Sequence, residues 1–281
     1  MRGKRTGSPV AGAFKYAACI LMALIIAIPL YAALSGGFKS LGELESHPFG
    51  LPIPFSTSTY AGLLDGTIGH LWRDMGNSLL VSALTVALDL LLCSAAAFAV
   101  ARIRFRLSGV IYGYFILGIL FPLAVAILPL YLQVRRLNLI NRYFGVILPQ
   151  VAFQMPLLIM LLRGFFKAIP NELEDATALD GYGPIGFFFY ITIPLSTPIL
   201  ATSAVLTLVT SWNNFFLPLL IFNSASKFTL PLGVMDFMGQ YSSQWNDILG
   251  FITLAMIPAV LLFILAQRYI VAGLTGGAIK G

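Results

Sequence analysis

Long apolar runs alternate with short polar segments along most of the chain. Six of these runs are long enough to cross a bilayer, which takes about 20 mostly apolar residues in a helix. They cover residues 13–35, 78–101, 109–132, 143–165, 196–222 and 248–268. None of them shows a sustained alternation of apolar and polar residues, which is the pattern of a barrel strand. The sequence therefore predicts six membrane-spanning α-helices.

The composition supports a membrane location. Of the 281 residues, 58% are hydrophobic and 10% are charged, whereas a soluble domain carries about 25% charged residues. So few charges cannot cover a globular surface, and most of the surface must therefore face lipid. We predict an all-α integral membrane protein.

Three parts are expected along the chain: an N-terminal segment 1–12, a six-span domain 13–268 and a C-terminal tail 269–281. The first apolar run follows a basic start, as in a cleavable signal peptide. However, Tyr16 to Leu34 is 19 residues without a charge, longer than the core of a typical signal peptide. We therefore expect this run to remain as the first span.

The lysine and arginine residues indicate the orientation. Of the 17, eleven fall at the termini and in the loops on the same side. These are Arg2, Lys4, Arg5, Lys15, Arg102, Arg104, Arg106, Arg163, Lys167, Arg268 and Lys280. Because cytoplasmic loops carry an excess of lysine and arginine, both termini are predicted to be cytoplasmic. The same bias explains the net charge of +6 without nucleic acid as a partner.

Metal and redox chemistry have little support in the sequence. Cys19 and Cys93 lie inside apolar runs, and His47 and His70 are isolated. We expect the cysteines to be small core residues and the histidines to be solvated or capping residues, with no metal site. The outer segment 223–247 could rest on the membrane interface or contact an outer partner.

An acidic segment, NELEDATALDGYGPIGFFFYITIP, lies between the fourth and fifth spans. Asn171 suits the N-cap of a short helix with Glu174 at its third position, as in a capping box. Gly181 can take a left-handed conformation and end that helix. Pro184 suits the first turn of a second helix. The sequence predicts a helix, a glycine turn and a second helix, exposed to the cytoplasm.

The carboxylates of this segment have two interpretations. They could only cap a connecting helix. However, the four acids Glu172, Glu174, Asp175 and Asp180 lie beside an inner leaflet that is itself usually negative. The small residues at 176–178 would also let another backbone approach. We therefore interpret the segment as a docking element for a basic cytoplasmic partner.

Polar residues within the spans are candidates for a substrate pathway. They are Trp212, Asn213 and Asn214 in the fifth span, and Gln150 and Gln154 in the fourth. Amides bond to hydroxyl groups and an indole face stacks on a sugar ring. The same residues could instead join helix to helix.

Asp89 is the only acid deep within a span. It could be a hydrogen-bonded structural carboxylate, or a site for a proton or cation.

The spacing in the acidic segment resembles a known family. Asp175-Ala176-Thr177 is followed by Gly181 and then by Ile191-Thr192-Ile193-Pro194. This is similar to the cytoplasmic loop of ABC importer permeases, which has Glu-Ala-Ala, three residues, Gly, nine residues and Ile-x-Leu-Pro. Asp175, Thr177 and Ile193 depart from that pattern. The stretch SWNNFFLPLL and the ending GLTGGAIKG resemble the carbohydrate branch, specifically the smaller maltose permease subunit.

The resemblance implies the type I ABC importer permease fold, with a coupling helix in the loop 171–194. It implies sugar transport across the bacterial inner membrane by alternating access. The implied partners are a second homologous permease, two cytosolic ATPases that bind ATP and Mg, and an extracytoplasmic binding protein. This chain would hold no cofactor and would not hydrolyse ATP, since it has no phosphate-binding loop motif.

The resemblance also assigns roles to individual residues. The residues expected to meet an ATPase in the coupling loop are Glu172, Glu174, Asp175, Ala176, Thr177, Asp180 and Gly181. Either Asp175 or the longer Glu174 could make the main contact. The tail residues expected at the ATPase interface are Gly273, Leu274, Thr275, Lys280 and Gly281, on a path that the glycines allow to be extended.

Two other classes of function have weaker support in the sequence. An ion-coupled secondary transporter of a small solute predicts several ionisable residues within the membrane and an internal repeat, but Asp89 stands alone and no clear repeat is present. A membrane-embedded enzyme or a scaffold without transport activity is the other, and no group of nucleophile, base or metal-ligand residues supports the enzyme.

Overall fold

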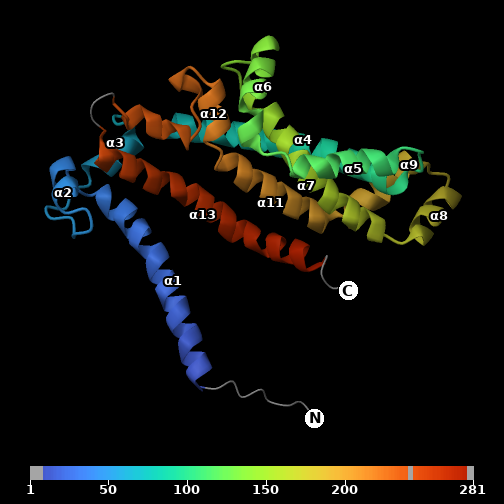
Figure 1. The fold of residues 1–281 in the computed structure, drawn as a ribbon, viewed down its shortest axis with the longest axis horizontal. Helices are drawn as coiled ribbons and strands as arrows, with labels where there is room; N and C mark the ends of the chain where they lie inside the picture. Colours follow the sequence, from blue (N-terminus) through green and yellow to red (C-terminus); the bar gives the residue numbers. More distant parts are fainter. Residues whose placement is uncertain (1–8, 240–242, 277–281) are drawn as a thin grey trace. The chain divides into compact units, whose positions relative to one another are not determined.

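The computed structural model of this chain describes residues 9–239 and 243–276, and every regular element in that part of the chain is a helix (Figure 1). The α-helices are α1 (Pro9–Gly36), α2 (Leu41–Ser46), α3 (Ser58–Asp65), α4 (Leu71–Arg102), α5 (Ser108–Ile119), α6 (Leu123–Arg136), α7 (Tyr143–Ala168), α8 (Asn171–Leu179), α9 (Pro184–Gly186), α10 (Ile193–Leu195), α11 (Thr197–Trp212), α12 (Phe216–Ile221) and α13 (Trp245–Gly276). A π-helix, η1 (Phe187–Thr192), joins α9 to α10, and two 3₁₀-helices, η2 (Ala225–Lys227) and η3 (Leu232–Phe237), follow α12.

Four of the described helices are long and apolar enough to cross a membrane, namely α1, α4, α7 and α13. Two pairs of shorter helices pass the same test together. The pair α5 and α6 is bent by 106°, and the pair formed by Pro184–Leu195 and α11 is bent by 76°. The described chain therefore has four to six candidate spans, and it reaches six when each bent pair counts as one span.

Prolines explain both bends. The run 109–132, expected as one helix, is divided between α5 and α6 at Phe121 and Pro122. A proline disfavours the helical conformation of the residue before it, and its ring collides with the preceding turn. At the second bend, the break falls at Ser196 and Pro198 stands in the first turn of α11, where the missing amide hydrogen costs nothing and the ring cannot continue a preceding helix. The run 196–222 is also two helices, because the chain leaves the helical conformation between Trp212 and Phe216.

The chain divides into two compact units, each of which is considered by itself. Unit 1 comprises residues 1–71 and 234–256. Within it, a Cβ atom added to Gly37 would lie 2.8 Å from the Cα atom of Gly250. Only glycine permits two backbones to approach so closely.

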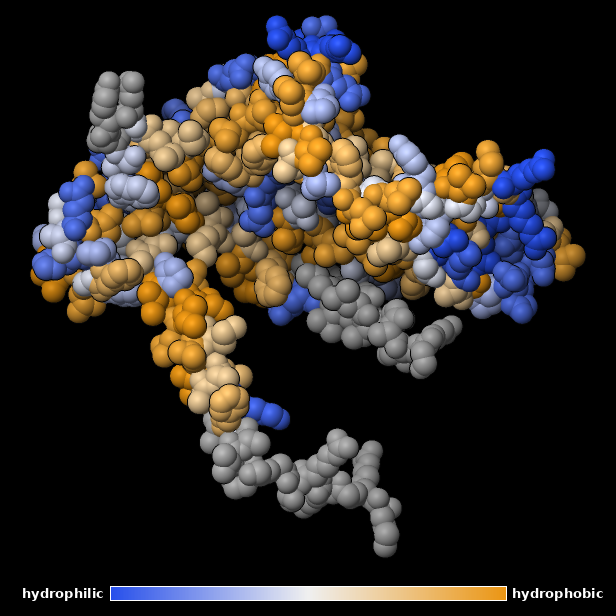
Figure 2. Space-filling model, viewed as in Figure 1, coloured by the Kyte–Doolittle hydropathy of each residue, from blue (hydrophilic) through white to orange (hydrophobic). Residues whose placement is uncertain are grey.

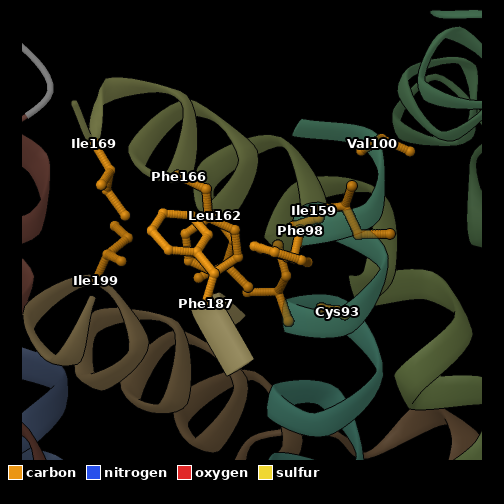
Figure 3. Packing of buried hydrophobic residues seen from close by; sticks show 11 residues of the cluster. Cys93, Phe98, Val100, Ile159, Leu162, Phe166, Ile169, Phe187 and Ile199 are labelled. Atoms are coloured by element: carbon orange, nitrogen blue, oxygen red, sulfur yellow. The ribbon is translucent and has the colours of Figure 1, made fainter. Parts of the chain in front are cut away.

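Unit 2 comprises residues 72–233 and 257–281. Helix α7 packs against α5 and α11 in it (Figure 1), and against α4 through buried apolar side chains. One hydrophobic cluster joins α4, α7, η1 and α11, and Figure 3 shows the rings of Phe166 and Phe187 at its centre. A second cluster joins α4, α6, α7 and α12 through residues such as Val81, Ile147 and Ile221. The first cluster lies at the end of α7 that leads to the acidic segment, and the second lies at the start of α7.

The path expected for the C-terminal tail is wrong in its first part. Helix α13 continues to Gly276, so Gly273, Leu274 and Thr275 are helical rather than extended. A glycine costs a helix only about 1 kcal/mol relative to alanine, and isolated glycines therefore do not end it. Lys280 and Gly281 lie outside the described residues.

Candidate functional site

Helix α8 and the turn after it form the acidic segment. The amide nitrogen of Tyr182 donates to the Thr177 carbonyl at 3.1 Å, and that of Gly181 donates to the Ala178 carbonyl at 3.0 Å. Gly181 has a φ of +85°, in the left-handed region where glycine carries no steric penalty. The prediction that Gly181 ends the helix is confirmed, and Pro184 opens the next helix as expected.

The predicted capping box at the start of α8 is wrong. Pro170 occupies the N-cap position, and no side chain caps the helix. The Oδ1 atom of Asn171 and the Oε2 atom of Glu174 instead accept hydrogen bonds from Nη1 of Arg102, at 2.7 and 3.4 Å. A buried guanidinium must find acceptors within the protein, and these side chains supply two of them.

The remaining acids of α8 point to solvent. Glu172, Asp175 and Asp180 are exposed, and no ion pair joins them to any described lysine or arginine. Leu179, with 90% of its surface exposed, lies among them. Figure 2 shows hydrophilic residues gathered at the α8 end of unit 2, next to a mostly hydrophobic surface. This surface can bind a partner that offers basic groups around an apolar pocket.

Small residues at 176 and 177 have different environments. Ala176 is exposed, whereas Thr177 is buried and its hydroxyl donates to the Leu173 carbonyl at 2.6 Å. Thr177 therefore faces the protein, and Ala176 lies on the side open to a partner.

A buried polar seam joins α4, α7 and α11 within unit 2. The Oε1 atom of Gln150 accepts hydrogen bonds from Ser211 Oγ at 2.6 Å and from Thr85 Oγ1 at 3.3 Å. The carboxylate of Asp89 accepts a hydrogen bond from Thr207 Oγ1 at 3.1 Å. Hydroxyl and carboxyl groups satisfied in this way join neighbouring helices.

These contacts bear on the residues proposed for a substrate pathway. Gln150 and Trp212 are only 3% and 4% exposed, so neither presents an accessible face in this conformation. Asn214 accepts a hydrogen bond from the amide of Leu217, in the first turn of α12, at 3.0 Å. Gln154 is half-buried and Asn213 is exposed. The seam favours helix packing for Gln150, and direct substrate contact by this set stays a prediction.

Sequence reasoning missed several members of the seam. Thr207 and Ser211 are four residues apart, and Thr85 has the same spacing from Asp89, the one member of the α4 side that the sequence had singled out. Residues four apart lie on one face of a helix. A search for polar residues at this spacing would have found the seam.

Metal binding has no support in the described part of the chain. No three His, Cys, Asp or Glu side chains there lie close enough together to hold an ion. Cys93 is buried beside Asp89, with the sulfur 3.9 Å from Oδ1.

Replacing Gln150 with alanine is expected to loosen the packing of α4, α7 and α11. The Ser211 and Thr85 hydroxyls would lose their shared acceptor, and such bonds within membranes contribute about 0.5–1.5 kcal/mol. We expect thermal unfolding in detergent to shift to lower temperature, with the transport KM unchanged. Gln133→Ala, the same change at an exposed position of α6, serves as the control. An increase in KM for Gln150→Ala with unchanged stability would instead assign Gln150 to the substrate pathway.

The chain matches the family model described as binding-protein-dependent transport system inner membrane component, over residues 91–276. The arabinooligosaccharides transport system permease protein AraQ of Halalkalibacterium halodurans is 33% identical over 284 residues, covering 99% of this chain and 100% of that protein. A probable ABC transporter permease protein of Bacillus subtilis, YurM, is 32% identical, covering 93% of this chain and 86% of the relative. This chain therefore belongs to the family of binding-protein-dependent transport system inner membrane components, the permease subunits of ABC importers.

The solved structures agree on the fold. A chain from the crystal structure of a bacterial ABC transporter involved in the import of the acidic polysaccharide alginate superposes with a TM-score of 0.81. It is 21% identical and covers 96% of this chain and 99% of that one. The protein therefore has the multi-pass helical fold of an ABC importer permease.

Proposed function

We propose that this chain is a permease subunit that moves a sugar or oligosaccharide across the bacterial cytoplasmic membrane by alternating access. Support for the sugar class comes from relatives named for arabinooligosaccharides and for multiple sugars, of which the latter, from Streptococcus mutans, is 30% identical over 272 residues. Hydroxyl-binding amides such as the exposed Asn213 suit such a substrate.

The observation that carries the proposal is the arrangement of α8, Gly181 and α9. Exposed carboxylates surround the apolar Leu179 on a short helix at the end of the long apolar helix α7. We propose that this helix docks in a groove of a cytosolic ATPase and transmits the movements of the ATPase to the membrane-spanning helices. The partner would bind the ATP and Mg, and this chain would supply no cofactor site of its own.

Further partners follow from the same proposal. In α1, none of the apolar 18-residue window is buried in the chain, so its surface is open to lipid or to a second homologous permease. A second permease, two ATPases and an extracytoplasmic binding protein would complete the importer. Both termini and α8 would lie in the cytoplasm, which agrees with the excess of lysine and arginine on that side.

Isolation of the complex tests this function. We expect the tagged chain, extracted in mild detergent, to bring with it an ATPase and a second permease. The complex is then reconstituted in liposomes, with the binding protein outside and the ATPases facing the lumen. It should take up labelled oligosaccharide only when ATP is enclosed in the lumen. Uptake that follows an ion gradient without ATP would overturn the proposal in favour of a secondary transporter.

A further inference from the structure

Arg102, the last residue of α4, has a buried guanidinium. Its side chain is 5% exposed, whereas Arg104 and Arg106 just beyond it are exposed. Charged side chains are seldom buried unless they are paired or hydrogen-bonded. Arg102 therefore has a different role from the loop arginines near it.

Arg102 binds the end of α7 through backbone carbonyls. Its Nε and Nη2 atoms donate to the Phe166 carbonyl at 3.0 and 2.6 Å, and Nη2 also donates to the Ile169 carbonyl. The last four carbonyls of a helix have no amide donor within the helix, so they accept hydrogen bonds from donors outside it. These bonds tie the end of α4 to the end of α7.

The third guanidinium nitrogen reaches across the linker to α8. Nη1 donates to Asn171 at 2.7 Å and pairs with Glu174 at 3.4 Å. Between α7 and α8, only Ile169 and Pro170 intervene, with extended ψ angles of 130° and 141°. Arg102 thus donates hydrogen bonds to acceptors in α7 and in α8, on both sides of a two-residue extended linker. Without these bonds, α8 could change its orientation relative to α7 at the linker.

The same guanidinium also lies against the hydrophobic core. Its Cζ atom is 5.8 Å from the centre of the Phe187 ring. Phe187 is buried in the cluster that Figure 3 shows, facing Phe166 and Leu162. Phe187 begins η1, the element that leads into α11, so Arg102 lies against α7, the linker, α8 and η1.

We propose that Arg102 is a positioning residue that fixes α8 to the ends of α4 and α7, so that a displacement of α8 moves these spans with it. A planar guanidinium with five donors in a fixed geometry suits this role better than a lysine, which is a single flexible charge. The proposal rests on the proposed function, since it assigns to α8 the part that receives the ATPase movement. An arginine that only capped α7 would stabilise the fold without affecting how α8 transmits movement.

The sharpest test removes only the α8 side of this arrangement. The double variant Asn171→Ala with Glu174→Ala removes both α8 acceptors and leaves the bonds from Arg102 to the α7 carbonyls in place. Arg102→Gln removes the bonds to both α7 and α8. Arg102→Lys keeps the positive charge without the planar guanidinium group. Arg104→Gln, at an exposed neighbouring position, is the matched control. Each variant is studied in the complete reconstituted importer, and the measured quantity is sugar moved per ATP hydrolysed.

We expect the double variant and Arg102→Gln to hydrolyse ATP while moving roughly fivefold less sugar per ATP. Arg102→Lys should fall between these and the wild type, and Arg104→Gln should match the wild type. If Arg102→Gln fails to assemble, the double variant decides the question. An unchanged ratio in the double variant would overturn the proposal.

A spectroscopic measurement separates this proposal from the proposed function. Spin labels at Gly164→Cys in α7 and Ala178→Cys in α8, both exposed positions, report the distance between the two helices when Cys19 and Cys93 are replaced. In the complex carrying the double variant we expect a broader distance distribution than in the wild type. An unchanged distribution would contradict the proposal that Arg102 fixes α8. The absence of ATP-driven uptake in the wild type would instead contradict the proposed function alone.

Discussion

Asp175→Arg is expected to abolish ATP-driven uptake while the protein still inserts and folds. Asp175 is exposed on α8, so a new cation there disturbs no contact within the chain. Against a basic docking groove, it replaces an attraction with a repulsion, and breaking a buried interfacial charge pair costs about 2–5 kcal/mol. Even about 2 kcal/mol corresponds to roughly 30-fold weaker binding. The measurement is uptake into liposomes together with retention of the ATPase on the tagged permease.

The structure explains why Asp175 is the better position for this test. Glu174, the alternative ATPase contact, is engaged with Arg102, so its reversal would disturb the protein itself. Asp175→Glu restores the residue type of the family loop and should keep full uptake. Glu45→Arg makes the same change of charge at an exposed site in α2 and should also have no effect. Normal uptake by Asp175→Arg would rule out a contact between this carboxylate and the ATPase.

Gly145→Val is expected to prevent normal folding of unit 2. Gly145 is buried near the start of α7, and an added Cβ atom would collide with the Leu139 carbonyl and lie 2.9 Å from Cγ2 of Ile221. Since the first of these is backbone, the clash can be relieved only by moving the segment that precedes α7. Overpacking of this kind costs about 1–3 kcal/mol or more. We expect most of the protein to aggregate or to melt at lower temperature in detergent.

Gly164 provides the matched control on the same helix. It is exposed, and an added Cβ atom would meet nothing within 4 Å. Gly164→Val should leave the melting temperature unchanged or raise it slightly, because valine is a better helix former than glycine. Equal melting temperatures for the two variants would mean that the approach of Gly145 to Leu139 is not required for the fold.

Local chemistry decides the features that could be predicted from the sequence. The long apolar runs identify the membrane helices, because the thickness of the bilayer sets a minimum length of apolar chain. Gly181 and Pro184 mark the turn after α8, because backbone conformation restricts which residues can stand there. The acidic loop with this spacing also indicated the family, which the match over residues 91–276 confirms.

Other features depend on which helices meet. Arg102 looked like one of three loop cations, and its role depends on the ends of α7 and α8 lying around it. The expected capping box failed for the same reason, since Arg102 recruits the side chains of Asn171 and Glu174.

The sequence by itself determined that this protein is a helical membrane protein with an acidic loop and a glycine turn, because apolar length and turn chemistry are local properties of the chain; the permease class came from the resemblance of that loop to a known family. Only the tertiary structure decided which polar groups are engaged and which are free. It buries Gln150 against Thr85 and Ser211 and leaves Asp175 exposed. The physical reason is that hydrogen-bond partners 60 or more residues apart in the chain are chosen by the packing of the helices, which no local pattern records.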